Sequence, residues 1–139
     1  MERMRSGRAV VLWFATVAYA VVIFIASSLP VPTPAPGTGP VGDKALHALE
    51  YGLFTLLLAA AISTVRNPRV NSRSALIAFA VATLYGLTDE LHQTFVPSRV
   101  GDSLDFVWDV VGAAVAAAAF HVWRSRVSRA APVSETSPR

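Results

Sequence analysis

Four apolar stretches of about 20 residues each constrain this 139-residue chain more than any other feature. The first, residues 9–29, carries no charge, and at about 1.5 Å of rise per helical residue it can cross a hydrocarbon core of about 30 Å. The others are expected at residues 44–65, 74–95 and 104–123. A content of 53% hydrophobic and 15% charged residues is typical of a membrane protein. We therefore predict an all-α fold, a bundle of four transmembrane helices spanning residues 9–123.

A cleaved signal peptide is the competing interpretation of the first stretch, because Arg3, Arg5 and Arg8 precede it and small residues close it. The apolar region of a signal peptide is usually about 7–15 residues long, which is shorter than this stretch. We therefore expect residues 1–8 to be a cytoplasmic N-terminus followed by a retained span.

The basic residues predict the orientation of the spans, since Lys and Arg near short loops are retained in the cytoplasm. They are concentrated in residues 1–8, 66–73 and 124–129, whereas the other two loops have one each, Lys44 and Arg99. Both termini are therefore expected to be cytoplasmic in a multi-pass protein of the cell membrane. The proline-rich residues 30–42 should form an extended outer loop, and residues 124–139 a basic, disordered cytoplasmic tail.

The same distribution limits the partners and the chemistry. The basic residues flank apolar stretches and form no stripe on a polar domain, so the lipid bilayer is the expected partner and nucleic acid is not. The chain has no cysteine, which excludes thiolate metal sites and a cysteine nucleophile. No oligomeric state is predicted.

Most acidic residues gather at the predicted outer ends of the spans. Helical spacing of about 100° per residue places them on three polar faces, one for each of the last three spans. The faces are Asp43, His47, Glu50 and Tyr51; Tyr85, Asp89, His92 and Gln93, with Glu90 turned away; and Asp102, Asp105, Asp109 and Gly112.

A carboxylate facing lipid costs a few kcal/mol, so we expect the three faces to meet in one polar cavity. Its seven acids oppose only Lys44 and Arg99, and this imbalance requires protonation, a bound divalent cation or water. Structural roles compete with binding at several positions: Asp43 and Asp102 suit helix caps, and Tyr51 suits the interfacial belt. Asp109 is the strongest candidate, since it lies about a turn inside its span.

Three motifs in this region resemble the VanZ-like family of small membrane proteins. They are Asp43-Lys44-x-x-His47-x-x-x-Tyr51, then Asp89-Glu90-x-x-Gln93, then Arg99 with Asp105 and Gly112. The resemblance implies a helical membrane protein at the cell surface, where the family's named member confers low-level resistance to the glycopeptide teicoplanin. It implies no established reaction. Asp109 stands where the family usually has Asn, which adds a carboxylate.

The leading functional prediction is a binder of a lipid-linked envelope precursor or glycopeptide, with an effect on glycopeptide susceptibility. The acidic balance favours a ligand with amines, or a phosphate bridged by a divalent cation. The predicted ligand-binding residues are Asp43, Lys44, His47, Tyr51, Asp89, Glu90, Gln93, Arg99, Asp105 and Asp109.

Two other functions remain open. An intramembrane hydrolase or transferase would use His47 or His92 as general base, oriented by Asp43 or Asp89, on a lipid substrate. A metal could assist it, with His47, Asp89, His92 and Asp105 as candidate ligands. Ion- or proton-coupled transport is the third, because intramembrane carboxylates are typical of it.

Overall fold

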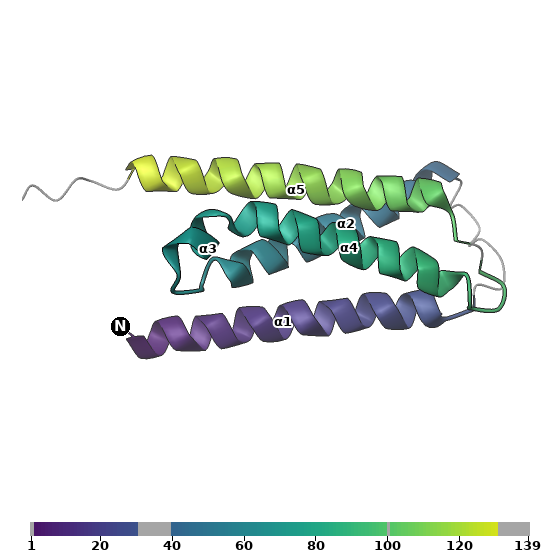
Figure 1. The fold of residues 1–139 in the computed structure, drawn as a ribbon, viewed down its shortest axis with the longest axis horizontal. Coiled ribbons are helices and arrows are strands. Elements are labelled where there is room, and N and C mark those ends of the chain that lie inside the picture. The colour runs from purple at the N-terminus through teal and green to yellow at the C-terminus, as the bar shows by residue number, and fades with distance from the viewer. Residues whose placement is uncertain (1, 31–39, 100, 131–139) are drawn as a thin grey trace, which may run out of the picture.

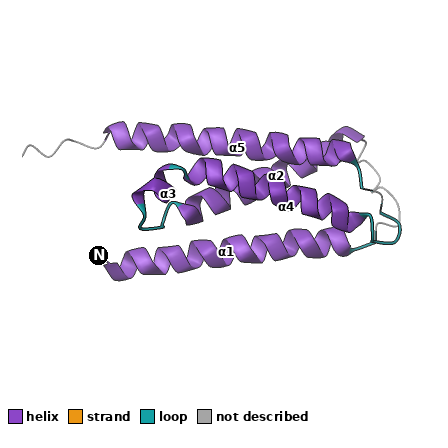
Figure 2. Cartoon of the chain, viewed as in Figure 1, coloured by secondary structure: helices purple, strands orange, loops and turns teal. Residues whose placement is uncertain are grey.

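The chain forms a bundle of long helices without strands in the part described by the computed structural model, which is residues 2–30, 40–99 and 101–130 (Figure 2). Its elements, in chain order, are α1 (Glu2–Ser28), α2 (Pro40–Ile62), α3 (Pro68–Ser72), α4 (Ser74–Gln93) and α5 (Ser103–Ala130). The four long helices run side by side, with α3 as a short turn of helix between α2 and α4 (Figure 1). The all-helical prediction is confirmed.

Each of the long helices is apolar and long enough to cross a membrane, over 6–28, 42–62, 74–93 and 103–129. Their large apolar side chains point outward along much of this length, as shown by Phe14, Leu49 and Val115, which are 76%, 69% and 65% exposed. Such a surface is stable in lipid and not in water. The protein is therefore a multi-pass membrane protein, as predicted.

Two helices extend beyond the bounds predicted from the sequence. Helix α2 begins at Pro40, so residues 40–42 are helical and are not part of the outer loop. Proline is tolerated there because the first turn of a helix has no partner for its N–H groups. Helix α5 continues to Ala130, so residues 124–130 are helical and do not belong to a disordered tail. The rest of the predicted loop and tail, residues 31–39 and 131–139, lies outside the described residues.

Small residues bring α2 and α5 into the most extensive contact of any helix pair. A Cβ atom on Gly112 would lie 2.0 Å from the carbonyl oxygen of Ala48. This distance is too short for any side chain, so only glycine fits at position 112. The Cβ of an alanine at Gly52 would in turn lie 3.4 Å from the carbonyl oxygen of Gly112. Close approach of this kind is how helices associate in lipid, where burial of apolar surface gives little driving force.

The end of the bundle that carries the chain's N-terminus is held together by Arg124 near the end of α5. Its guanidinium donates hydrogen bonds to the carbonyl oxygen of Asn71, at 2.8 Å, and to Oγ of Ser74, at 2.9 Å. Asn67 caps α3 by accepting a hydrogen bond from the Arg69 amide. These contacts fix the turn between α2 and α4 against α5.

The start of α1 and the end of α5 lie at the same end of the bundle (Figure 1). The opposite end collects the C-terminal ends of α1 and α4 and the N-terminal ends of α2 and α5. Most of the acidic residues predicted from sequence to share a cavity lie at this second end, which we call the acidic end.

Candidate functional site

The outermost part of the site surrounds Lys44, in the first turns of α2. Its ammonium donates a hydrogen bond of 2.7 Å to Oδ2 of Asp102 and another to Asp105, and it lies 3.8 Å from Oδ2 of Asp43. We call Asp43, Lys44, Asp102 and Asp105 the rim group. Three carboxylates oppose one ammonium here, so the rim group has an excess of negative charge.

Asp102 has two structural roles in the rim group. Its Oδ1 accepts a hydrogen bond of 2.9 Å from the Leu104 amide, which makes it the N-cap of α5. Its own amide donates a hydrogen bond of 3.0 Å to Oε2 of Glu90, which ties α4 to the start of α5. The Lys44 ammonium and the Leu104 amide both stabilise the carboxylate, and they hold the pKa of Asp102 below its ordinary value of 3.8.

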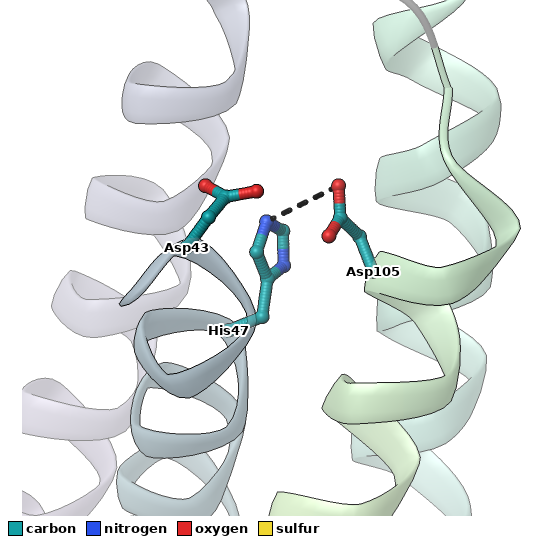
Figure 3. Close-up of side chains that lie close together, drawn as sticks. All are labelled: Asp43, His47 and Asp105. Carbon is teal, nitrogen blue, oxygen red and sulfur yellow. Dashed lines mark ion pairs between the residues drawn. The ribbon is translucent and has the colours of Figure 1, made fainter. Parts of the chain in front are cut away.

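His47 lies one helical turn further along α2 and is held between two carboxylates of α5. Its Nδ1 is 2.9 Å from Oδ1 of Asp109, and its Nε2 is 3.7 Å from Oδ2 of Asp105. Figure 3 shows the imidazole turned toward Asp105, with Asp43 on its other side. The sequence prediction paired this histidine with Asp43, whereas the structure gives it Asp109 as the hydrogen-bonding carboxylate.

Behind His47 lies a second set of side chains that are almost completely buried. Asp109 is 1% exposed and Glu90 is 8% exposed, and one oxygen of each, Oδ2 and Oε1 respectively, is buried with no hydrogen-bond partner among the described residues. We call His47, Glu90 and Asp109 the inner group. Buried carboxylate oxygens are costly without a donor or a cation, so the inner group is electrostatically incomplete.

Gly86 on α4 makes room for this arrangement. A Cβ atom there would lie 3.1 Å from Cε1 of Tyr51 and 3.3 Å from Oδ2 of Asp109, both tighter than ordinary contact. Tyr51 is itself 1% exposed, and its hydroxyl is buried with no hydrogen-bond partner in the residues that the structure describes. Tyr51 is thus a core residue and not a member of the interfacial belt.

Arg99 braces the helix ends. Val96 to Arg99 form a turn, closed by a 3.1 Å hydrogen bond from the Arg99 amide to the Val96 carbonyl, with Ser98 at a φ of 66°. The turn directs the guanidinium to the C-terminal end of α1, where it donates to the carbonyl oxygens of Leu29, at 3.1 Å, and Ala26, at 2.7 Å. Carbonyl groups at the end of a helix lack the usual N–H partner four residues further on, and that of Ala26 also accepts a 3.3 Å hydrogen bond from the Leu29 amide.

Asp89 and Gln93 form a buried pair on α4, in which the Gln93 amide donates a 3.1 Å hydrogen bond to Oδ2 of Asp89. Oε1 of Gln93 lies 3.4 Å from Nη1 of Arg99. His92 turns away from both of them. Its Nε2 is 3.0 Å from Oγ of Ser28, and its ring packs against Phe24 on α1.

The predicted polar faces of α2 and α5 therefore meet, while that of α4 is different. Glu90, which the helical spacing turned away from the site, belongs to the inner group, and His92, which the spacing placed on the site face, contacts α1. The reason is that α4 packs against α2 and α5 and also contacts α1, so polar residues on more than one of its sides find partners. In the sequence, the signal that Glu90 also needs a partner was its position directly after Asp89, and the structure buries both carboxylates.

Two sets of side chains are close enough to share a metal ion. In the first, Asp43, His47 and Asp105 each bring one ligand atom within 4.8 Å of the others, and in the second, His47, Glu90 and Asp109 do so. Of the four metal ligands predicted from sequence, His47 and Asp105 occur in these sets and Asp89 and His92 do not. Glu90 and Asp109 are the carboxylates that the prediction of metal ligands left out.

A hollow of about 740 Å³ lies at the opposite end of the bundle from the acidic residues. Its lining includes Arg8 and Arg66 and the polar residues Ser63, Thr64 and Asn71. Arginines at the end of a transmembrane bundle lie at the depth of phospholipid headgroups. We therefore assign this hollow to the headgroup region of the membrane, at the end of the bundle opposite the acidic end.

These features define the class of protein: a small multi-pass membrane protein with a buried acidic and histidine-containing centre at one end of its bundle. A sequence model of the family described as VanZ/LLP1 matches residues 8–124, so the chain belongs to this family. No curated protein and no solved structure matches the chain.

Proposed function

We propose that this VanZ/LLP1 protein acts at the outer face of the cytoplasmic membrane, where its acidic end binds a lipid-linked envelope precursor or a glycopeptide. The rim group would recognise a positively charged group of the ligand, such as an amine. Through this binding the protein would alter the response of the cell to glycopeptides such as teicoplanin.

One observation carries the choice of ligand charge: both basic side chains at the acidic end already have partners within the protein. Lys44 is held by Asp102 and Asp105, and Arg99 is held by the end of α1. A bare phosphate or carboxylate would therefore have to displace an internal contact. An amine meets the surplus carboxylates directly, and the side chains of Asp43 and Asp102 are 55% and 43% exposed to receive it.

The surroundings of the rim group suit a ligand with a lipid tail. Leu46 and Leu49 on α2 are 56% and 69% exposed, and Leu104 and Val107 on α5 are 58% and 50% exposed. These apolar side chains lie within about two turns of Asp43 or Asp105, so the acidic end continues directly into a lipid-facing surface. A ligand anchored in the bilayer could present its polar head here without leaving the membrane.

The test uses the full chain in lipid nanodiscs and a lipid-linked precursor that carries a free amine. We expect acetylation of the amine to weaken binding by about 10-fold, corresponding to about 1.4 kcal/mol, and Asp43→Asn to weaken binding of the free amine similarly. Asp89→Asn is the matched control, because Asp89, although predicted from the sequence to bind ligand, lies outside the rim group, where it is buried and paired with Gln93. The proposal would be contradicted if acetylation and Asp43→Asn both left the affinity unchanged and if deletion of the protein left the teicoplanin susceptibility of the cells unchanged.

A second candidate function rests on the contact between His47 and Asp109. A carboxylate 2.9 Å from an imidazole nitrogen fixes the orientation of the ring and stabilises its protonated form, which is the arrangement of a general base. On this alternative the protein is a hydrolase or transferase acting on a lipid phosphate or ester, with water or a metal-bound hydroxide as nucleophile.

Lipid turnover by the purified protein tests the alternative. We expect His47→Ala to abolish turnover, whereas His92→Ala should keep most of it, since His92 faces Ser28. Full activity in the His47→Ala variant would exclude this histidine as the base.

Ion- or proton-coupled transport has less support. Directly beyond the inner group, the core of the bundle is an apolar cluster that includes Ile23, Phe54 and Ala113, followed by a second that includes Leu58 and Phe120. An ion would have to cross both clusters. Flux in proteoliposomes that disappears with Asp109→Ala would favour transport over the binding function.

A further inference from the structure

We propose that the inner group, His47, Glu90 and Asp109, is a binding site for a divalent transition-metal ion of the Zn²⁺ type. The site joins three helices, because its ligands come from α2, α4 and α5. It goes beyond the proposed binding function and does not rest on it, since ion binding can be measured with no precursor present.

The first support is geometry. One ligand atom from each residue lies within 4.8 Å of the other two. A zinc ion at about 2.0–2.2 Å from its ligands holds them roughly 3–4 Å apart, so small side-chain rotations would complete the site. No helix would have to move, and these side chains project from helices that are already packed together.

The second support is independent of the clustering, and it is the unpaired oxygens. Within the part of the chain that the structure describes, Oδ2 of Asp109 and Oε1 of Glu90 are buried without a hydrogen-bond partner, and both residues are more than nine-tenths buried. The imidazole of His47 reaches Oδ1 of Asp109, at 2.9 Å, and so leaves the other oxygen without a donor. A divalent cation between the three side chains would satisfy both carboxylates at once.

The donor set indicates the class of ion. One imidazole nitrogen and two carboxylate oxygens suit Zn²⁺ and its first-row neighbours, whereas Mg²⁺ and Ca²⁺ prefer oxygen ligands alone. Three protein ligands also leave a position open for water or for a ligand group.

The rim group supplies what surrounds such a site. Oδ2 of Asp105 lies 3.7 Å from Nε2 of His47, where a carboxylate can orient a metal-bound imidazole, and Lys44 holds Asp105 in place. The exposed Asp43 is close to the same ring and offers an ion its first contact from the aqueous side (Figure 3). An ion could thus pass from the rim group to the inner group while His47 remains a ligand, with Asp43 and Asp105 replaced by Glu90 and Asp109.

The experiment measures Zn²⁺ bound to the full chain in detergent, by elemental analysis after dialysis, together with the shift of Tm on adding Zn²⁺ or Mg²⁺. We expect about one Zn²⁺ per chain and a higher Tm with Zn²⁺ than with Mg²⁺. Glu90→Gln and Asp109→Asn should each weaken Zn²⁺ affinity by at least about 10-fold. Losing a residue that only hydrogen-bonds to a metal ligand already has an effect of this size, and the loss of a ligand should have at least as large an effect.

Asp43→Asn separates the two sets of side chains that share His47. This variant should keep Zn²⁺ affinity within about threefold of wild type, because Asp43 lies outside the inner group. A wild-type chain that neither retains Zn²⁺ nor gains Tm would overturn the proposal. So would Zn²⁺ binding that is lost in Asp43→Asn and kept in Glu90→Gln, since the ion would then occupy the rim.

Discussion

At the scale of single residues, charged side chains at the acidic end act as braces as well as candidate ligands. Asp102 caps α5, accepts a hydrogen bond from Lys44 and links to Glu90 through its amide. Arg99 donates hydrogen bonds to backbone carbonyl groups at the end of α1. A residue of this kind is needed for the shape of the site even where it never contacts a ligand.

The pair formed by Lys44 and Asp102 gives a prediction about pH. Because the pKa of Asp102 is lower in the folded protein than its ordinary value of 3.8, the unfolded chain binds the proton more readily. The stabilisation is therefore present above pH 3.8 and is lost as the pH falls through the lower, folded-state pKa. Asp102→Asn should lower Tm slightly near neutral pH and should have no effect on Tm once wild-type Asp102 is protonated.

Asparagine is the informative substitution because it is also a good N-cap and so preserves the hydrogen bond to Leu104. The measurement is Tm in detergent for both proteins between about pH 7 and pH 2. A difference in Tm between the two proteins that stays constant over this whole range would show that the ion pair contributes nothing. Added salt should reduce the difference at neutral pH, since the side chain of Asp102 is partly exposed.

At the scale of helices, the contact between α2 and α5 positions the site. The carbonyl of Ala48 lies where a side chain on Gly112 would be, and His47 precedes Ala48 by one residue. Asp109, whose Oδ1 lies 2.9 Å from Nδ1 of His47, lies less than one turn before Gly112. The hydrogen bond of the site is thus a consequence of close backbone packing next to it.

We predict that Gly112→Ala destabilises the protein by at least about 1–3 kcal/mol, because α5 must move away from α2. The sign is informative, since glycine to alanine within a helix normally stabilises by up to about 1 kcal/mol. Gly7→Ala in α1 is the matched control, because a Cβ there meets no described atom within 4 Å, and it should leave stability unchanged or raise it. Unfolding in a denaturing detergent compares the variants, and equal behaviour of the two would contradict the close contact.

At the scale of the whole molecule, the two ends of the bundle differ in charge. Arginines at one end include Arg8, Arg66 and Arg124, and carboxylates gather at the other. This asymmetry favours an insertion in which the arginine-rich end stays in the cytoplasm. The proposed binding of an envelope precursor or glycopeptide requires the acidic end to face outward.

Single cysteines test this orientation, since the chain has none of its own. Ser103 and Ser128 are exposed near opposite ends of α5, and at about 1.5 Å per residue they are separated by more than the thickness of the hydrocarbon core. A membrane-impermeant maleimide should label Ser103→Cys in intact cells and Ser128→Cys only after permeabilisation. The reverse pattern would place the acidic end in the cytoplasm and exclude an envelope ligand there.

Much of this organisation could be predicted from the sequence. Apolar length identified the four spans, and helical spacing predicted that Asp43 and His47 share one face of the second span, where the structure brings both close to Asp105. The prediction of helix ends was less accurate, because Pro40 is compatible with a first turn and the basic residues after Trp123 can extend a helix. Local composition does not distinguish such helical ends from loops.

The sequence by itself determined the membrane class, the helices and the acidic end, because hydrophobic length and charge are properties of a segment in isolation. Only the tertiary structure decided which carboxylate pairs with His47, that Glu90 is inside the site and His92 is outside it, and that Lys44 and Arg99 already have partners. Helical spacing gives the direction of a side chain about its own axis. The partner in that direction depends on how closely and in what rotation the helices pack, which the contact of Gly112 with Ala48 sets.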